Sequence, residues 1–581
     1  MRMHDRFSGS GPAARKTVRA GKLHALHAAR LLMRTEKQHA TLSTVVITMI
    51  TVISLLIGAL CAAPISAFAA GGSGDGETVV LRVCNWEEYI DLGDWDEEET
   101  IELDSGDIIG ENSMVEDFEE WYEETYGIHV KVEYSTFGTN EDLYNMLTLG
   151  DEYDLVCPSE YMFMKLMTEK QLVPLSEDFF DTSVEENYYV RGISPYIKKV
   201  FDDHEIGGEP WSRYAAGYMW GVTGIVYNPE VVSKEEASTW KILNNPKFVR
   251  QVTIKDNVRD SYFAAVGAIK SDLLTSEAFR SDPDYAQKLE DEMNDTSPEM
   301  IAQVQDYLQQ VKDNVYSFET DSGKSDMITG KVVANYQWSG DGVYSLDQAA
   351  EDDFDLCFAV PEESTNIYFD GWVMLKNGIR DNAAKQHAAE AFINFNSRPD
   401  NVVRNMYYIG YTSVISGGDD PTIFEYAEYN YGAEDDEEET EVYDLSFFFE
   451  GEESAEAEES DEGSEDAVSS GVAESVEDAE DGEGDEDEEE IGEYVIEAPI
   501  DQFDRQLYAA YPPQEVMDRS SVMVFFDEEQ NAAINRMWIN VRCYNITKAP
   551  VWAFAIAAVV LCGVIYLAVL RIKAVIKKRS A

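Results

Sequence analysis

The sequence is poor in basic residues, with 44 Lys and Arg against 113 Asp and Glu, a net charge of -69 and a pI of about 4.2. Proteins that bind nucleic acid neutralise phosphates with Lys and Arg. This charge balance therefore excludes a nucleic-acid-binding protein. It is compatible with cationic ligands, which a negative field attracts.

Cysteine and histidine are also scarce. The six cysteines, at positions 61, 84, 157, 357, 543 and 562, form no Cys-x-x-Cys pair and no Cys/His spacing, so we expect no zinc site. Cys84 and Cys157 each end a predicted strand, and either a buried thiol pair or a disulfide fits them. Of the seven histidines, four lie within residues 1–43, and His129, His204 and His387 are isolated from any nucleophile motif. We expect neither an enzyme nor a cofactor.

Two long apolar runs lie near the two ends of the chain. Residues 1–43 form a basic leader, and residues 44–70 form a signal peptide or transmembrane anchor, with Ala67-Phe68-Ala69 favouring cleavage. Residues 551–570 are long and apolar enough to cross a bilayer, and the tail at 571–581 is basic. The basic segments beside a membrane span stay on the cytoplasmic side. Both apolar runs therefore predict that the chain between them lies outside the cell.

Between these runs, short β-rich segments alternate with helical ones, which predicts an α/β fold. The expected helices cover 115–126, 140–149, 299–311, 383–395 and 528–541. The expected strands cover 128–134, 153–157, 218–227, 252–254, 332–338, 358–361 and 367–375. Two acidic stretches interrupt the pattern. We interpret 91–112 as a solvated loop and 434–490 as a disordered insertion.

The stretch from Val83 to Ile90, with sequence VCNWEEYI, follows a β-rich run and precedes an acidic loop. Open α/β sheets bind ligands at the carboxyl ends of their strands. Two aromatics here flank two carboxylates, a combination that suits an ammonium group on an apolar stem. A surface loop with one buried Trp is the alternative.

Further strand-end motifs follow in order: YDLVCPSEYM, KDNVRD, QWSGDG and YFDGW, together with YGIHVKVEYSTFGTNEDLY, WGVTGIVYN, AAEAFINFNSRPDNV and YIGYTSV. In this order they resemble the bacterial spermidine/putrescine-binding proteins, the extracytoplasmic receptors of polyamine ABC importers. The resemblance covers about 78–412 and, more weakly, 500–542. It excludes both apolar runs, 91–112 and the acidic tract.

The resemblance implies a two-lobed, periplasmic-binding-protein-like (Venus-flytrap) α/β fold that closes on its ligand. Lobe one takes 78–215 and 362–412, and lobe two takes 216–361 and 494–545. The implied partners are a polyamine, ABC permease subunits and, through them, a cytoplasmic ATPase. The protein is expected at the cell membrane, with its globular domain on the extracytoplasmic side.

The resemblance also implies a ligand site. The residues that fall on family ligand contacts are Trp86, Glu88, Tyr89, Ser159, Tyr161, Asn257, Asp260, Trp338, Tyr368, Asp370 and Tyr411. Asn257 stands where many relatives have a carboxylate, and Tyr368 where many have Trp. In this assignment Asp260 and Asp370 pair ammonium groups, while the aromatic rings stack along the methylenes.

Several alternatives remain open. Trp338 and Tyr368 also fit ordinary core aromatics, and Asp260 with Arg259 fits a surface ion pair. Ser159 also fits a plain helix cap. At the level of function, an anchored surface protein for sensing or adhesion, or an importer receptor for another small cation or a peptide, is the alternative. The sequence does not select one polyamine.

Overall fold

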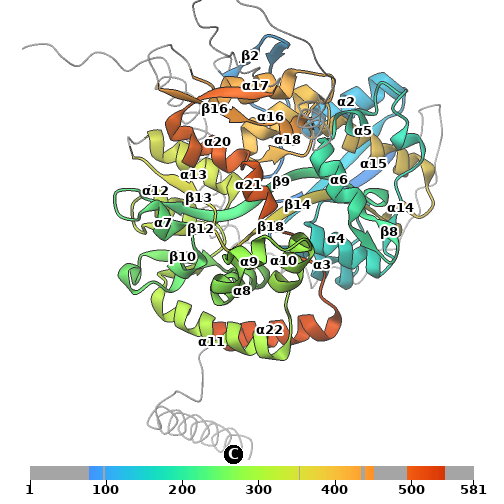
Figure 1. The fold of residues 1–581 in the computed structure, drawn as a ribbon. Helices are drawn as coiled ribbons and strands as arrows, with labels where there is room; N and C mark the ends of the chain where they lie inside the picture. Colours follow the sequence, from blue (N-terminus) through green and yellow to red (C-terminus); the bar gives the residue numbers. More distant parts are fainter. Residues whose placement is uncertain (1–77, 96–98, 352–353, 434–438, 451–493, 544–581) are drawn as a thin grey trace, which may run out of the picture.

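The fold is organised around two long antiparallel strands, β9 (Ala215–Tyr227) and β14 (Thr365–Leu375), at the middle of a 12-stranded sheet. The computed structural model describes residues 78–95, 99–351, 354–433, 439–450 and 494–543 (Figure 1). Every residue of both strands is buried, as in α/β sheets covered on both faces. Figure 1 shows β9 and β14 passing through the centre of the molecule.

The first half of the sheet extends from β14 through three strands, β5 (Leu155–Val156), β1 (Val79–Trp86) and β4 (Val130–Phe137). β1 runs parallel to both of its neighbours, so crossover connections are needed. They are supplied by α2 (Met114–Tyr126) and α3 (Asn140–Leu149). Both helices begin at a side-chain cap and end at a glycine in the left-handed region, Gly127 or Gly150.

The second half extends from β9 through β12 (Ala334–Trp338), β10 (Val252–Lys255) and β11 (Ser317–Glu319). Its main helices are α8 (Val258–Leu274), α11 (Pro298–Asn314), α13 (Ser339–Glu351) and α22 (Glu528–Arg542). Although α22 is distant in sequence, it packs along α11 (Figure 1). Gln309 Nε2 donates to the Asn540 carbonyl at 2.9 Å across this contact.

The remaining elements are shorter or cover the two halves. The helices are α4 (Glu160–Thr168), α5 (Tyr188–Gly192), α6 (Pro195–Asp203), α7 (Lys234–Ala237), α9 (Glu277–Arg280), α10 (Tyr285–Met293), α12 (Ser322–Ile328), α14 (Lys376–Ile379), α15 (Ala383–Asn396), α16 (Pro399–Ile409), α17 (Thr422–Tyr431), α18 (Ser446–Phe449), α20 (Gln506–Ala510) and α21 (Gln514–Asp518). The strands are β2 (Ile101–Leu103), β3 (Gly106–Ile108), β6 (Leu172–Val173), β7 (Glu205–Ile206), β8 (Glu209–Pro210), β13 (Cys357–Ala359), β15 (Thr412–Ser413), β16 (Thr440–Asp444), β17 (Val495–Pro499) and β18 (Ser520–Ser521). The 3₁₀ helices are η2 (Asp178–Phe180), η3 (Trp211–Arg213), η4 (Trp240–Asn244), η5 (Pro246–Phe248) and η6 (Ile500–Asp504).

The carboxyl ends of β1, β5, β10 and β12 carry the residues that the sequence singled out, as expected for an open α/β sheet. The α/β architecture predicted from the sequence is confirmed. Each predicted helix and strand has a counterpart in the structure, and the helix over 140–149 matches α3 at both ends. Cys84 and Cys157 are buried free thiols, which decides between the two alternatives for that pair.

The prediction of a solvated loop over 91–112 is wrong. This segment contains the hairpin of β2 and β3, which packs against α16 and α17. Trp95, Ile101 and Ile108 are buried, and the Trp95 ring lies 4.9 Å from that of Tyr407 between ring centroids. These three apolar side chains bury enough surface to order a stretch that is otherwise acidic.

The predicted start of the disordered insertion, at 434, is also wrong. β16 pairs antiparallel with β17, and α18 follows it. Phe448 stacks on Trp220 at 5.6 Å, and the Tyr443 hydroxyl donates to the Tyr511 carbonyl at 2.6 Å. Buried aromatic side chains therefore hold 439–450 on the folded domain. The rest of the predicted insertion, 434–438 and 451–490, lies outside the described residues.

Within the described part of the chain, no helix is both long and apolar enough to cross a bilayer. The apolar runs at 44–70 and 551–570, with their basic flanks, lie outside the described residues.

Candidate functional site

Asp370 lies at the centre of the candidate site. It occupies a bulge of β14 and is 5% exposed. Its carboxylate accepts hydrogen bonds from the Tyr89 hydroxyl at 2.8 Å and from Ser159 Oγ at 2.7 Å. Burial raises the pKa of Asp370 to about 6, against the opposing effect of these hydrogen bonds. A buried carboxylate held only by neutral groups is well placed to pair with a ligand cation.

Ser159 precedes α4 at the helix-cap position, yet its side chain makes no capping hydrogen bond. It donates to Asp370 instead. Asn140, at the start of α3, holds it in place: Asn140 Nδ2 donates to Ser159 Oγ at 3.1 Å and to the Tyr161 hydroxyl at 3.0 Å. The geometry therefore favours a site residue over a plain cap.

Four tyrosines form an aromatic cluster beside Asp370. The ring of Tyr89 lies 5.6 Å from Tyr218 and 5.0 Å from Tyr411, and Tyr411 lies 6.5 Å from Tyr368, between ring centroids. These edge-to-face arrangements are favourable for aromatic pairs. The cluster brings Tyr89, Tyr368 and Tyr411 together, as the resemblance implied.

The loop after β1 is bent sharply to bring Tyr89 to this cluster. Glu88 adopts a left-handed backbone with φ of 57°. Hydrogen bonds to the Tyr89 carbonyl, from Asn85 Nδ2 at 3.1 Å and the Tyr218 hydroxyl at 2.9 Å, hold the bend. A strained non-glycine residue persists where surrounding contacts fix it, often at functional sites. The Glu88 side chain itself is exposed.

Trp86 is half-buried at the end of β1, with its ring 4.7 Å from Phe137 between centroids. Its indole N–H is buried without a hydrogen-bond partner in the described part of the chain, although it lies close enough to Asp370 to lower the pKa of that carboxyl. Because an ammonium group cannot accept from this N–H, any contact of Trp86 with a cationic ligand is through the ring face.

The second half of the sheet contributes Asp260 and Trp338. Asp260 lies in the first turn of α8 and is 5% exposed, which excludes the surface ion pair with Arg259. Burial raises the pKa of Asp260 to about 6, while the charge of Lys255 and a hydrogen bond from Trp338 act in the opposite direction. Tyr161 lies near Asp260 as well as bonding Asn140, and so connects the two halves of the site.

Asn257 does not join this cluster through its side-chain oxygen. Asn257 Oδ1 caps α8, accepting from the backbone N–H of Arg259 at 2.8 Å and of Asp260 at 3.3 Å. The side chain is only partly buried. Its contact with a ligand stays a prediction, and its observed role is to fix the helix that carries Asp260.

Several charged residues that sequence reasoning missed also lie in the site. Asp341, in α13, pairs with Lys324 at 3.2 Å and with Lys255 at 3.6 Å. Burial acts to raise the pKa of Asp341, but these two ammonium groups outweigh it and lower the pKa. Lys255 and Asp341 stand within the motifs KDNVRD and QWSGDG, so their positions at strand ends were the available signal.

Arg259 is a further charged residue at the border of the site. Its guanidinium lies 4.6 Å from the ring centroid of Tyr161 and 3.9 Å from that of Phe526, and it donates to the Val524 carbonyl at 2.7 Å. The C-terminal segment near Val524, where the family resemblance is weaker, therefore reaches the border of the site.

Chemically, the site is suited to binding a cation rather than to catalysis. Its two carboxylates with raised pKa lie among aromatic rings, and the described residues contain no cluster of three His, Cys, Asp or Glu side chains that could hold a metal ion. An anion site would offer backbone N–H groups at helix N-termini. Here acidic side chains stand at the strand ends.

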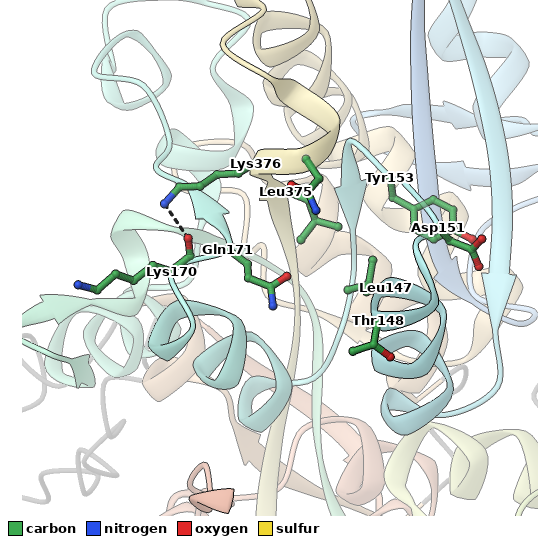
Figure 2. Close-up of a pocket in the computed structure, with 9 residues that line it drawn as sticks. Leu147, Thr148, Asp151, Tyr153, Lys170, Gln171, Leu375 and Lys376 are labelled. Atoms are coloured by element: carbon green, nitrogen blue, oxygen red, sulfur yellow. Dashed lines mark hydrogen bonds between the residues drawn. The ribbon is translucent and has the colours of Figure 1, made fainter.

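A separate cavity of about 370 Å³ lies at the amino-terminal end of β5, the opposite end from Ser159 (Figure 2). Its lining includes Lys170 and Lys376, whose ammonium group donates to the Lys170 carbonyl at 2.7 Å. With two lysines and one acidic residue, Asp151, this cavity is a poor place for a cationic ligand. The cluster around Asp370 remains the candidate site.

Comparison with known proteins agrees with this chemistry. A model of the family described as bacterial extracellular solute-binding protein matches residues 113–427. The putrescine-binding periplasmic protein PotF of Escherichia coli is 23% identical over 367 residues, which cover 62% of this chain and 82% of that protein. The spermidine/putrescine-binding periplasmic protein 1 of Haemophilus influenzae is 24% identical over 245 residues, covering 42% of this chain and 58% of that protein.

Among solved structures, the spermidine/putrescine ABC transporter substrate-binding protein PotD from Streptococcus pneumoniae is similar, with 20% identity and a TM-score of 0.47. The match covers 80% of this chain and 98% of that structure.

Proposed function

The chain belongs to the bacterial extracellular solute-binding protein family, and we propose that it is the substrate-binding component of an ABC importer for polyamines. The observation that carries this proposal is the Asp370 carboxylate, which is buried among the neutral side chains of Tyr89, Ser159 and Trp86 and, within the described residues, pairs with no cationic side chain. An ammonium group supplies the charge that this environment lacks.

A polyamine is a string of ammonium groups on methylenes, so its site needs carboxylates at intervals and aromatic surfaces between them. Asp370 and Asp260 supply buried carboxylates from the two halves of the sheet. The tyrosine cluster and Trp338 supply ring surfaces between and beside them. The names of the two curated relatives, which bind putrescine or spermidine and putrescine, support the same ligand class.

The two halves of the sheet act as two lobes in this proposal. Lobe one comprises 78–215 and 362–412, and lobe two comprises 216–361 and 494–545, so β9 and β14 connect them. Tyr89, Asp260 and Asp370 are all at most 6% exposed, which corresponds to a closed arrangement. Ligand entry then requires the lobes to open about the connecting strands.

The globular domain acts outside the cell and is tethered to the membrane. Its anchor is the apolar run at 551–570, with the basic tail at 571–581 in the cytoplasm. Residues 44–70 act as a signal peptide cleaved after Ala69. Permease subunits accept the ligand from the closed domain, and a cytoplasmic ATPase drives transport. Tethering raises the effective concentration of the receptor at the permease, so a weak contact between them suffices.

A ligand screen tests this proposal. The full-length chain, purified in mild detergent, is heated with polyamines, amino acids, sugars or anions, each in a separate sample. A polyamine at 100 times its Kd stabilises the fold by about 2.7 kcal/mol and raises the melting temperature. If polyamines at millimolar concentration leave the melting temperature unchanged while another ligand class raises it, the proposed function is wrong.

A further inference from the structure

The Lys255 ammonium group occupies the part of the site that faces Trp338. Lys255 is the last residue of β10, and its side chain is fully buried. Its Nζ lies 3.8 Å from the centre of the Trp338 ring and 3.6 Å from Asp341 Oδ2. It also donates to the Thr320 carbonyl at 3.0 Å and to Gln337 Oε1.

These neighbours are the groups that a bound ammonium ion uses: an aromatic face, a carboxylate and neutral oxygens. Lys255 is also the charged group that acts most strongly on Asp260, where it opposes the effect of burial on the pKa. The chain's own ammonium therefore already stands among Asp260, Trp338 and Asp341. A second ammonium there would meet like charge at short range, which is strongly unfavourable in a buried site.

Lys324 adds to the same effect. Its ammonium group lies 3.2 Å from Asp341 Oδ1 and 2.8 Å from Asp321 Oδ1. Two lysines consequently share the Asp341 carboxylate. Asp341 therefore offers a ligand no uncompensated negative charge, and a ligand ammonium that reached Asp260 would meet the ammonium group of Lys255.

Asp370 is different. Within the described ranges no lysine, arginine or histidine forms an ion pair with it, and its hydrogen bonds come from the hydroxyls of Ser159 and Tyr89. Among the described residues, it is the aspartate of these three on which no lysine or arginine charge acts. The site therefore has one open ammonium position and one already filled.

We propose that Lys255 is a specificity-determining residue that fills an ammonium subsite, so that the site selects short amines with one or two ammonium groups over triamines and longer polyamines. The inference rests on the proposed function and narrows its ligand class. One ammonium of the ligand pairs with Asp370. While Lys255 stands beside Trp338, that end of the site accepts the apolar methylenes of a ligand but not a further ammonium group.

The test compares putrescine with spermidine by calorimetric titration of the full-length chain and of Lys255→Met. Methionine keeps an unbranched apolar stem and removes the ammonium group. The matched control is Lys270→Met, which removes a lysine of the same half of the sheet whose ammonium pairs with Glu292 at 2.5 Å and Asp295 at 3.0 Å, neither of which is a site residue.

The wild-type chain is expected to bind putrescine at least about tenfold more tightly than spermidine, the discrimination that one uncompensated charge contact provides. Lys255→Met is expected to tighten spermidine binding by about tenfold or more and to change putrescine binding less. Lys270→Met is expected to leave the ratio of the two affinities unchanged. Equal gains for both ligands in Lys255→Met, or spermidine preferred by the wild-type chain, would overturn the inference.

If Lys255→Met does not fold, Lys255→Gln keeps a donor for the Thr320 carbonyl and removes the charge. The ratio of the wild-type affinities for putrescine and spermidine also tests the inference by itself. The failure of this inference is distinct from the failure of the proposed function. A wild-type chain that binds putrescine and spermidine equally well refutes the role of Lys255 but keeps a polyamine receptor. A chain that binds neither refutes the receptor itself.

Discussion

Ser159 Oγ donates a hydrogen bond of 2.7 Å to Asp370 Oδ1, although the two residues are 211 positions apart in the sequence. Ser159 is in turn held by Asn140, whose Oδ1 accepts from the Ser159 backbone N–H at 3.1 Å. This chain of contacts joins the starts of α3 and α4 to the bulge of β14. It fixes the direction of the Asp370 carboxylate before any ligand arrives.

Ser159→Ala removes one of the two hydroxyl donors to Asp370. Because the lost hydrogen bond favoured the ionised form, we expect the pKa of Asp370 to rise further and amine binding near neutral pH to weaken about five- to tenfold. Calorimetric titration at several pH values measures both effects. Ser183→Ala, which removes an exposed hydrogen bond of 2.6 Å to Asp181, is the control. Unchanged affinity with an unchanged pH midpoint would show that Ser159 does not orient Asp370.

Amine binding is expected to weaken as the pH falls below about 6, because Asp370 has a pKa of about 6 in the ligand-free fold. A cation binds the ionised carboxylate and must displace a proton at lower pH, so affinity falls by up to about tenfold per pH unit. Titrations from about pH 7.5 to about pH 5 measure this. Affinity that stays constant over this range would contradict the account.

The stability of the ligand-free fold is expected to move the other way. Since the pKa of Asp370 is raised from 3.8 to about 6 in the folded state, ionisation of Asp370 destabilises the fold above about pH 6. That cost is relieved as the pH falls through about 6 towards the unfolded value. The difference in unfolding free energy between Asp370→Asn and the wild-type chain should therefore shrink on acidification. A difference independent of pH would contradict the raised pKa.

Asp91→Ala tests whether the segment after β1 is structural. Asp91 is fully buried and accepts from Arg404 Nε at 2.9 Å and from Trp95 Nε1 at 3.1 Å. Removing it leaves the buried Arg404 guanidinium with the partly exposed Asp117, 2.7 Å away, as its remaining carboxylate partner. We therefore expect the free energy of unfolding to fall by about 1.5–3 kcal/mol, the effect of losing hydrogen bonds between charged groups. Urea denaturation measures the loss, and the exposed Glu111→Ala is the control. Equal effects of both substitutions would mean that the segment adds no stability.

The proposed orientation in the membrane is tested with protease added to intact cells. The basic tail behind 551–570 places that end in the cytoplasm. The globular domain should therefore be digested from outside, leaving a short C-terminal stub. If the domain is protected until the cells are lysed, its orientation is the reverse of the one proposed, and a role in import is contradicted.

Local sequence signals predicted the main helices and strands well where caps and patterns agree. The helix over 140–149 is bounded by Thr139, which caps it, and by Gly150 in the left-handed region. The positions of Ser159 and Asp260 after strand ends followed from the order of strands and loops together with the family resemblance, whereas Asp370 lies within β14, at its bulge. The structure brings these three residues into one site.

The elements that sequence reasoning missed depend on partners far away in the chain. The hairpin of β2 and β3 is composed mainly of acidic residues and glycine, but Trp95 is buried against Tyr407, more than 300 positions later. Lys255 stands in the polar sequence KDNVRD, which predicts a polar loop after a strand. Its burial follows from Gln337, Trp338 and Asp341 on neighbouring elements, and no local pattern encodes those contacts.

The central claim is that the candidate site binds an amine through Asp370, and calorimetric titration of putrescine into the full-length wild-type chain and into Asp370→Asn tests it most directly. We expect saturable binding by the wild-type chain and at least about tenfold weaker binding by Asp370→Asn, the effect of losing a charge-assisted hydrogen bond. Glu87→Gln removes an exposed charge close by in sequence and should change the affinity little. Equal losses for Asp370→Asn and Glu87→Gln would reduce the effect to general electrostatics, and no binding by the wild-type chain would contradict the claim outright.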